Sequence, residues 1–142
     1  MKVYRHLSEK ELNLMLEGKT QALGNYFSKP TKEMKYRKNT HNYDESTKYI
    51  HFFKNKNSLK MMSYINKNLN GNFYFCTFDI PFKELIFHGG KGFYPSPGYE
   101  TDGILKEYAV PVDKFKTEWL IEYTLDEDRE NMTLAKAYDY IK

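Results

Sequence analysis

The segment that most constrains the fold is the run of residues 73–80, in which aromatic side chains recur at short intervals and Pro81 follows directly. Phe and Tyr are enriched in strands, and Pro cannot donate to a strand ladder, so the run predicts a strand that ends before the proline. Thirteen Tyr and ten Phe in the whole chain can bury a large apolar area. The sequence therefore predicts a sheet with an aromatic core.

Other short apolar or alternating runs, each bounded by turn residues, predict further strands. They lie at residues 2–6, 49–53, 84–87, 106–112 and 118–123. Two polar segments, 19–47 and 88–103, carry no sustained periodicity, and Gly and Pro are frequent in the second, so both are predicted to be loops.

Three helices are predicted between these strands. Ser8 and Glu11 have the spacing of a capping box, and Gly18 supplies the stop signal of the first helix. The second helix starts with Asn57 or Ser58 as its cap and continues to residue 70, and the third covers 132–141. Because helices and strands do not alternate regularly, we expect an α+β fold with a mainly antiparallel sheet and two or three helices.

Chain length and charge limit the possible classes of protein. A chain of 142 residues and 17.0 kDa predicts a single domain over residues 1–142. The net charge of +3 is too small to mark a nucleic-acid binder, but residues 26–60 form a locally basic stretch with interleaved aromatic residues. Such a stretch is usually a solvated face, and it also has the side chains to hold a phosphate-bearing ligand.

Cysteine usage and hydropathy indicate the compartment. The lone Cys76 lies in an apolar run and predicts a core residue in a reducing environment, without disulfides. No window has the length and hydrophobicity of a membrane span or a signal peptide, so we expect a cytoplasmic protein that makes no membrane contact.

Several kinds of catalytic site have weak support in the sequence. The four His residues are dispersed and a single Cys offers no thiolate cluster, so no metal site is predicted. Neither a nucleophile elbow nor a phosphate-binding glycine loop of the common types occurs.

A series of short motifs resembles the arginine, serine-threonine, glutamate series of ADP-ribosyltransferases. The series consists of Arg5 in the opening strand, Ser46 and Thr47 before the aromatic strand 49–53, and Glu107 at the head of a later strand. The resemblance spans about residues 3–123. It implies an ADP-ribosyltransferase-like fold in a small, stand-alone protein of the toxin or phage-effector type.

The resemblance also implies the role of each residue. An enzyme of this family uses NAD as a substrate, cleaves its nicotinamide glycosidic bond and transfers ADP-ribose to an acceptor. Glu107 would then be the catalytic carboxylate. Cofactor-binding roles fall to Arg5, Ser46, Thr47, Tyr49 and Phe52. Either Tyr49 or Phe52 would stack on the nicotinamide, and the polar tip of Tyr49 favours Tyr49.

The acceptor stays open. Leu105 stands where many arginine-modifying members of the family have Glu or Gln, so the resemblance disfavours arginine as the acceptor and leaves another protein side chain, a nucleic acid or a small molecule. A host protein or a nucleic acid is the expected partner, and the basic stretch favours an anionic one.

Each assignment has an alternative. Arg5 is equally consistent with a surface ion pair, and Glu107 with a solvent-facing strand residue, while Glu118 and Glu122 are other possible carboxylates. For the whole protein, the first alternative is a non-catalytic binding protein, either a phage-type inhibitor or a nucleic-acid binder, that acts through residues 26–60. The second is a small ribonuclease toxin that uses Tyr, Lys, Arg and His side chains.

Overall fold

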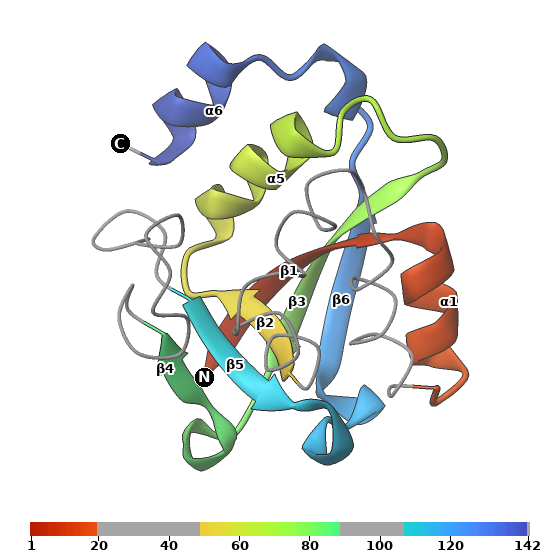
Figure 1. Cartoon of the computed structure of the whole chain (residues 1–142), viewed down its shortest axis with the longest axis vertical. Helices are drawn as coiled ribbons and strands as arrows, with labels where there is room; N and C mark the ends of the chain where they lie inside the picture. The colour runs from red at the N-terminus through yellow and green to blue at the C-terminus, as the bar shows by residue number, and fades with distance from the viewer. Residues whose placement is uncertain (20–48, 89–106, 142) are drawn as a thin grey trace, which may run out of the picture.

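The computed structural model describes residues 1–19, 49–88 and 107–141, and these form a sheet with helices packed against it (Figure 1). The sheet has six strands in the order β4-β5-β2-β1-β3-β6, and every neighbouring pair is antiparallel. The strands are β1 (Lys2–Ser8), β2 (Tyr49–Phe53), β3 (Phe73–Asp79), β4 (Ile86–His88), β5 (Glu107–Pro111) and β6 (Leu120–Leu125). The predicted α+β class and antiparallel sheet are confirmed.

Three α-helices accompany the sheet in the described part of the chain. They are α1 (Glu9–Leu16), α5 (Leu59–Ile65) and α6 (Leu134–Ile141). The strand β1 runs directly into α1, and α5 and α6 lie together at one end of the molecule (Figure 1).

The sheet is divided at its middle. Seven residue pairs join β1 to β3, from Lys2↔Asp79 to Ser8↔Phe73. By contrast, Tyr4↔Phe53 is the one pair that joins β1 to β2 in the described residues. The sheet therefore consists of two three-stranded halves, β4-β5-β2 and β1-β3-β6, that meet along a seam at Tyr4 and Phe53.

Strand alternation gives the sheet two different faces. We call one the core face, because its residues Val3, Leu7, Phe52, Cys76 and Phe78 belong to the main buried cluster. We call the other the α5 face, because α5 covers part of it. Its members are Tyr4, His6, Phe53, Phe75 and Thr77.

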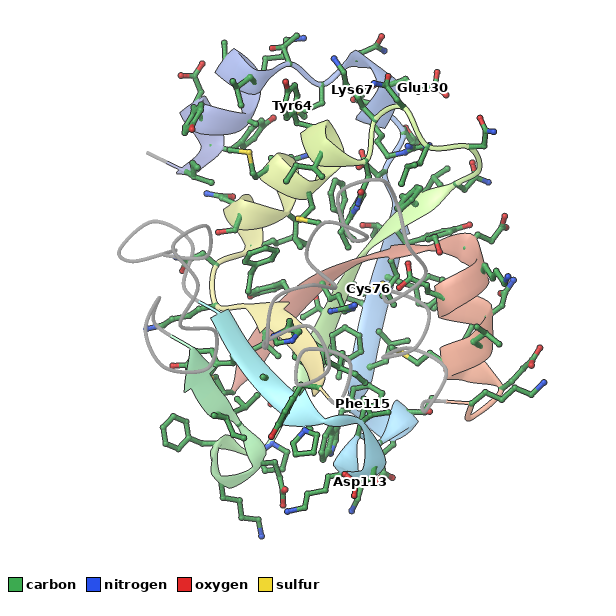
Figure 2. All side chains as sticks on the ribbon, viewed as in Figure 1. Tyr64, Lys67, Cys76, Asp113, Phe115 and Glu130 are labelled. Atoms are coloured by element: carbon green, nitrogen blue, oxygen red, sulfur yellow. The ribbon has the colours of Figure 1, made fainter. Side chains whose placement is uncertain are left out.

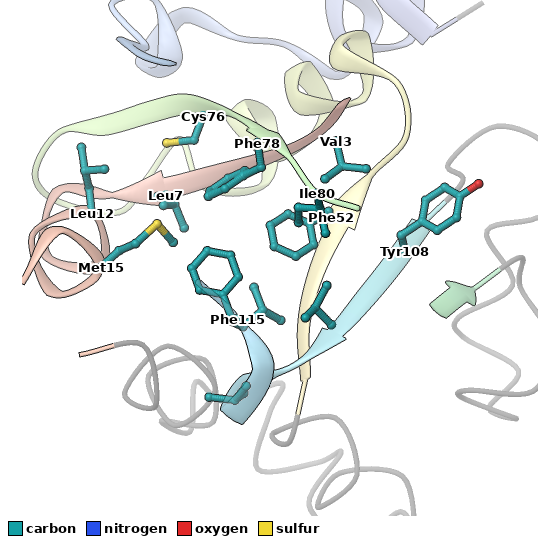
Figure 3. Close-up of a cluster of buried hydrophobic side chains, with 13 residues drawn as sticks. Val3, Leu7, Leu12, Met15, Phe52, Cys76, Phe78, Ile80, Tyr108 and Phe115 are labelled. Atoms are coloured by element: carbon teal, nitrogen blue, oxygen red, sulfur yellow. The ribbon is translucent and has the colours of Figure 1, made fainter. Parts of the chain in front are cut away.

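The main hydrophobic core fills the space between the two half-sheets, α1 and the turn that follows β5 (Figure 3). Phe52, Phe78 and Phe115 contact one another in it, with ring centroids 5.0 to 6.1 Å apart. Rings thus form the centre of the core, as the composition predicts. Burial of such aromatic side chains is the main favourable term for this fold.

The start of α1 follows its sequence signal. Ser8 Oγ accepts from the Glu11 amide at 3.2 Å, and the Ser8 amide donates to Glu11 Oε1 at 3.0 Å, so the capping box is complete. Gly18, with φ of +78°, adopts the left-handed conformation expected after a helix end.

The second helix differs from its prediction at both ends. Ser58 has helical φ and ψ and makes no capping bond, because a 3₁₀ turn (Lys56–Ser58) leads into α5. The helix ends at Ile65 rather than at residue 70. Beyond it, Asn66 turns its side chain to His6, and its carbonyl accepts from Arg129, so these tertiary bonds replace the next helical turn.

Candidate functional site

The catalytic candidate Glu107 lies in a row of residues that crosses three strands. In the register of the sheet Glu107 pairs with Phe53, and Phe53 pairs with Tyr4. Paired residues share a face, so Glu107 takes its position on the α5 face, about 10 Å from Tyr4 at two strand spacings. This row crosses the seam between the two half-sheets.

Arg5 takes a different position from the one that the resemblance implies. It pairs with Cys76 and therefore belongs to the core face, opposite to Glu107. Its guanidinium Nη1 donates to the carbonyl oxygen of His51 on β2, beyond the point where β1 and β2 separate. Arg5 thus ties the two half-sheets together, and the prediction that Arg5 and Glu107 hold one ligand gains no support from the register.

A buried carboxylate accompanies Arg5. Glu11 is 1% exposed, and burial raises the pKa of its carboxyl while the positive charge of Arg5 opposes that rise. Glu11 Oε1 accepts from the Ser8 amide, and Oε2 has no hydrogen-bond partner among the described residues. The electrostatic attraction to Arg5 helps to keep this charge in the interior.

Cys76 lies on the core face inside the molecule (Figure 2). Burial raises the pKa of its thiol to about 12, and the nearby Glu11 charge acts in the same direction. A thiol with this pKa forms almost no thiolate at neutral pH. Cys76 is therefore a core residue, as predicted, and it is a poor nucleophile.

The other predicted ligand residues do not gather around Glu107. Phe52 is 1% exposed in the aromatic core, so the prediction that it stacks on a ligand is wrong: strand alternation turns it toward Phe78. Tyr49 shares the alternation of Phe53 but pairs with Pro111 at the opposite end of β2. Ser46 and Thr47 lie outside the described residues.

Two hollows open beside helix α6. The smaller, of about 400 Å³, is lined by Tyr4, Lys54, Asn55, Lys56, Asn57, Ser58, Tyr140 and Ile141. The larger, of about 870 Å³, is lined by Lys60, Asp128, Asn131, Met132, Lys136, Asp139 and Tyr140. The smaller hollow contains Tyr4 and begins directly after Phe53, so it adjoins the row that carries Glu107.

Part of the smaller hollow has a signal in the sequence. Lys54 and Lys56 belong to the basic stretch 26–60, for which the sequence leaves two interpretations open, a solvated face and a site for a phosphate-bearing ligand. Tyr4 and Tyr140 were not foreseen there, because they come from opposite ends of the chain and only the tertiary fold brings them to one surface.

A buried polar network lies under α5. His6 Nε2 donates to Asp126 Oδ2 at 2.9 Å, and Ser63 Oγ donates to the same oxygen at 2.6 Å. On the other side of the imidazole, the Asn66 amide donates to His6 Nδ1 at 3.1 Å. Burial lowers the pKa of His6 against the opposing effect of Asp126, which fits a neutral ring that donates once and accepts once.

This network contains the three residue types of a hydrolytic triad but not their order. A nucleophilic serine donates its hydrogen bond to the imidazole that acts as its base, whereas Ser63 donates to the carboxylate of Asp126. The His6 and Asp126 side chains are also 0% and 2% exposed, so a substrate has no access to them. The network therefore stabilises the fold and holds the loop after α5.

The described residues offer neither a metal site nor a membrane-spanning helix. In the described part of the chain, His, Cys, Asp and Glu side chains form no group of three or more that is suited to a metal ion. Over the same residues, no helix combines the length and apolar character needed to cross a bilayer. Comparisons with protein-family models, curated proteins and solved structures found no match.

Proposed function

We propose that this chain is an ADP-ribosyltransferase-like enzyme that cleaves NAD at the nicotinamide glycosidic bond, with Glu107 as the catalytic carboxylate. The observation that carries the proposal is the row Tyr4, Phe53 and Glu107, which sets two aromatic residues and a carboxylic acid on one face of three neighbouring strands. The motifs that resemble the family lie in or beside these three strands. Arg5 lies in β1, Ser46 and Thr47 precede β2 in the sequence, and Glu107 begins β5.

The chemistry of this reaction needs such a carboxylate. The bond between nicotinamide and ribose breaks, nicotinamide leaves with the bonding electron pair, and positive charge develops on the ribose. A carboxylate beside the ribose stabilises that charge mainly in the transition state, so it raises the rate. A nucleophilic atom of the acceptor then bonds to the ribose carbon, and its proton passes to solvent.

The aromatic members of the row have a matching use. Tyr4 and Phe53 are both partly exposed. Their rings offer planar apolar surface against which nicotinamide can stack. In this proposal Arg5 acts from the core face, where its bond to the His51 carbonyl keeps β1 and β2, and therefore Tyr4 and Phe53, in place.

The experiment that tests this function measures nicotinamide release from NAD by the wild type and by Glu107→Gln. The substitution keeps the size of the side chain and removes its charge, so we expect a loss of about 100-fold or more, as for removal of one transition-state contact.

A matched control exists on β6. Glu122 pairs with Thr77 on the same α5 face and accepts from the Thr77 hydroxyl at 3.3 Å, and three strands separate β6 from β5. Glu122→Gln should keep the wild-type rate. Equal rates for wild type and Glu107→Gln would refute the catalytic role.

A second candidate function is binding without catalysis. The observation in its favour is that Lys54 and Lys56, from the basic stretch, line a hollow. Such a protein would release no nicotinamide, and its affinity for an anionic partner would fall steeply with rising salt.

A further inference from the structure

The smaller hollow differs from the larger one in its charge. Among the described residues that line it, Lys54 and Lys56 are cationic and none is acidic. In the larger hollow, Asp128 and Asp139 stand with two lysines and balance their charge. Of these two hollows, the smaller one therefore presents a net positive lining from the described residues.

The remaining groups of the smaller hollow suit an oxyanion. The amides of Asn55 and Asn57 and the hydroxyl of Ser58 can donate hydrogen bonds, and two lysine ammonium groups can donate charge-assisted ones. A diphosphate presents many acceptor oxygens and at least two negative charges, so it matches this set of donors.

The hollow also has aromatic side chains at its border. Tyr4 and Tyr140 contribute rings from the first strand and the last helix. Rings beside cations are the combination that holds the base and the phosphates of a nucleotide together. A volume of about 400 Å³ is within the range of small-molecule sites.

From these observations we infer that the hollow lined by Tyr4, Lys54, Lys56 and Tyr140 binds the diphosphate group of a nucleotide. The identity of that nucleotide as NAD rests on the proposed function, because the hollow adjoins the row that carries Glu107. A separate phosphate-bearing ligand, such as a nucleotide acceptor, is the other source of the same chemistry.

The test measures the affinity of inorganic pyrophosphate and of NAD by calorimetry at low salt. The proteins are the wild type, the double variant Lys54→Ala/Lys56→Ala, and Lys136→Ala, a lysine of the larger hollow, as the control. Both lysines of the double variant are exposed, so the fold should persist, and its thermal midpoint is measured to verify this. Glu107→Gln is included to separate this inference from the catalytic one.

We expect the double variant to bind pyrophosphate at least about tenfold more weakly than the wild type, since one charge-assisted contact alone is worth that factor. Lys136→Ala and Glu107→Gln should bind it normally. A parallel loss of NAD affinity identifies NAD as the source of the diphosphate, and unchanged NAD affinity identifies a separate ligand.

Two results would overturn the inference: a wild type that binds no pyrophosphate, or a folded double variant that binds it as tightly as the wild type. If neither the wild type nor any variant releases nicotinamide from NAD, the enzymatic proposal fails. The inference of a diphosphate site still stands in that case, provided that pyrophosphate binding depends on Lys54 and Lys56.

Discussion

Replacing Asp126 by Ala tests whether the buried network under α5 holds the fold together. The side chain of Asp126 is 2% exposed, and its Oδ2 atom accepts from both His6 and Ser63. Removing the carboxylate leaves the buried His6 N–H without an acceptor, whereas the Ser63 hydroxyl can still donate to the Leu59 carbonyl, which lies 3.2 Å away.

The magnitude follows mainly from the His6 donor. A buried donor that loses its partner costs about 1–3 kcal/mol, and the Ser63 hydroxyl exchanges a charged acceptor for a neutral one, so Asp126→Ala should lower the free energy of unfolding by about 3 kcal/mol. Asp126→Asn is the matched variant, because an amide oxygen in the Oδ2 position can still accept from both donors. It loses only the assistance of the charge, so we expect a cost nearer 1 kcal/mol.

The assay is urea unfolding at pH 7.5, with the slope of the transition checked for constancy. Asp128→Ala, at an exposed position close in sequence, is the control and should change stability by less than about 0.5 kcal/mol. The reasoning would be refuted if Asp126→Ala and Asp126→Asn cost the same, or if both stayed close to the wild type.

Two further predictions concern protonation. Because folding lowers the pKa of His6, its contribution to stability is complete above its unfolded pKa of about 6.5 and is lost as pH falls toward the folded value. The urea concentration at the unfolding midpoint of the wild type should therefore decrease as pH is lowered from 7.5 to 5, and His6→Gln should reduce this decrease. An equal decrease in both proteins would contradict the prediction. Because the pKa of Cys76 is about 12, the native thiol should resist an aromatic disulfide reagent at pH 8 and react rapidly in urea. Fast reaction of the folded protein would show that Cys76 is accessible.

The elements of the fold were largely predictable because their signals are local. The capping box of Ser8 and Glu11 needs only four consecutive residues, and the bounds of β2 match the predicted strand at both ends. The early end of α5 was not predictable, since Asn66 leaves the helix for partners, His6 and Arg129, that lie about sixty residues away in either direction.

The candidate site was predictable only in part, for a reason of strand geometry. Glu107 takes a place on a face with Tyr4 and Phe53, but a shift of one residue decides the face on which a strand residue lies. Arg5 and Phe52 each stand one position away from that row, so both belong to the core face. The order of motifs along a sequence does not say on which face of the sheet each residue lies. The pairing register of the strands does.

The seam between the two half-sheets also affects how the fold can vary. Few backbone bonds cross it, so a change in the distance between β1 and β2 leaves the ladders on either side intact. The spacing at this line is set by side chains, notably the guanidinium of Arg5 that reaches the carbonyl of His51. Substitutions near that contact can therefore change the gap at the seam without breaking a strand ladder on either side.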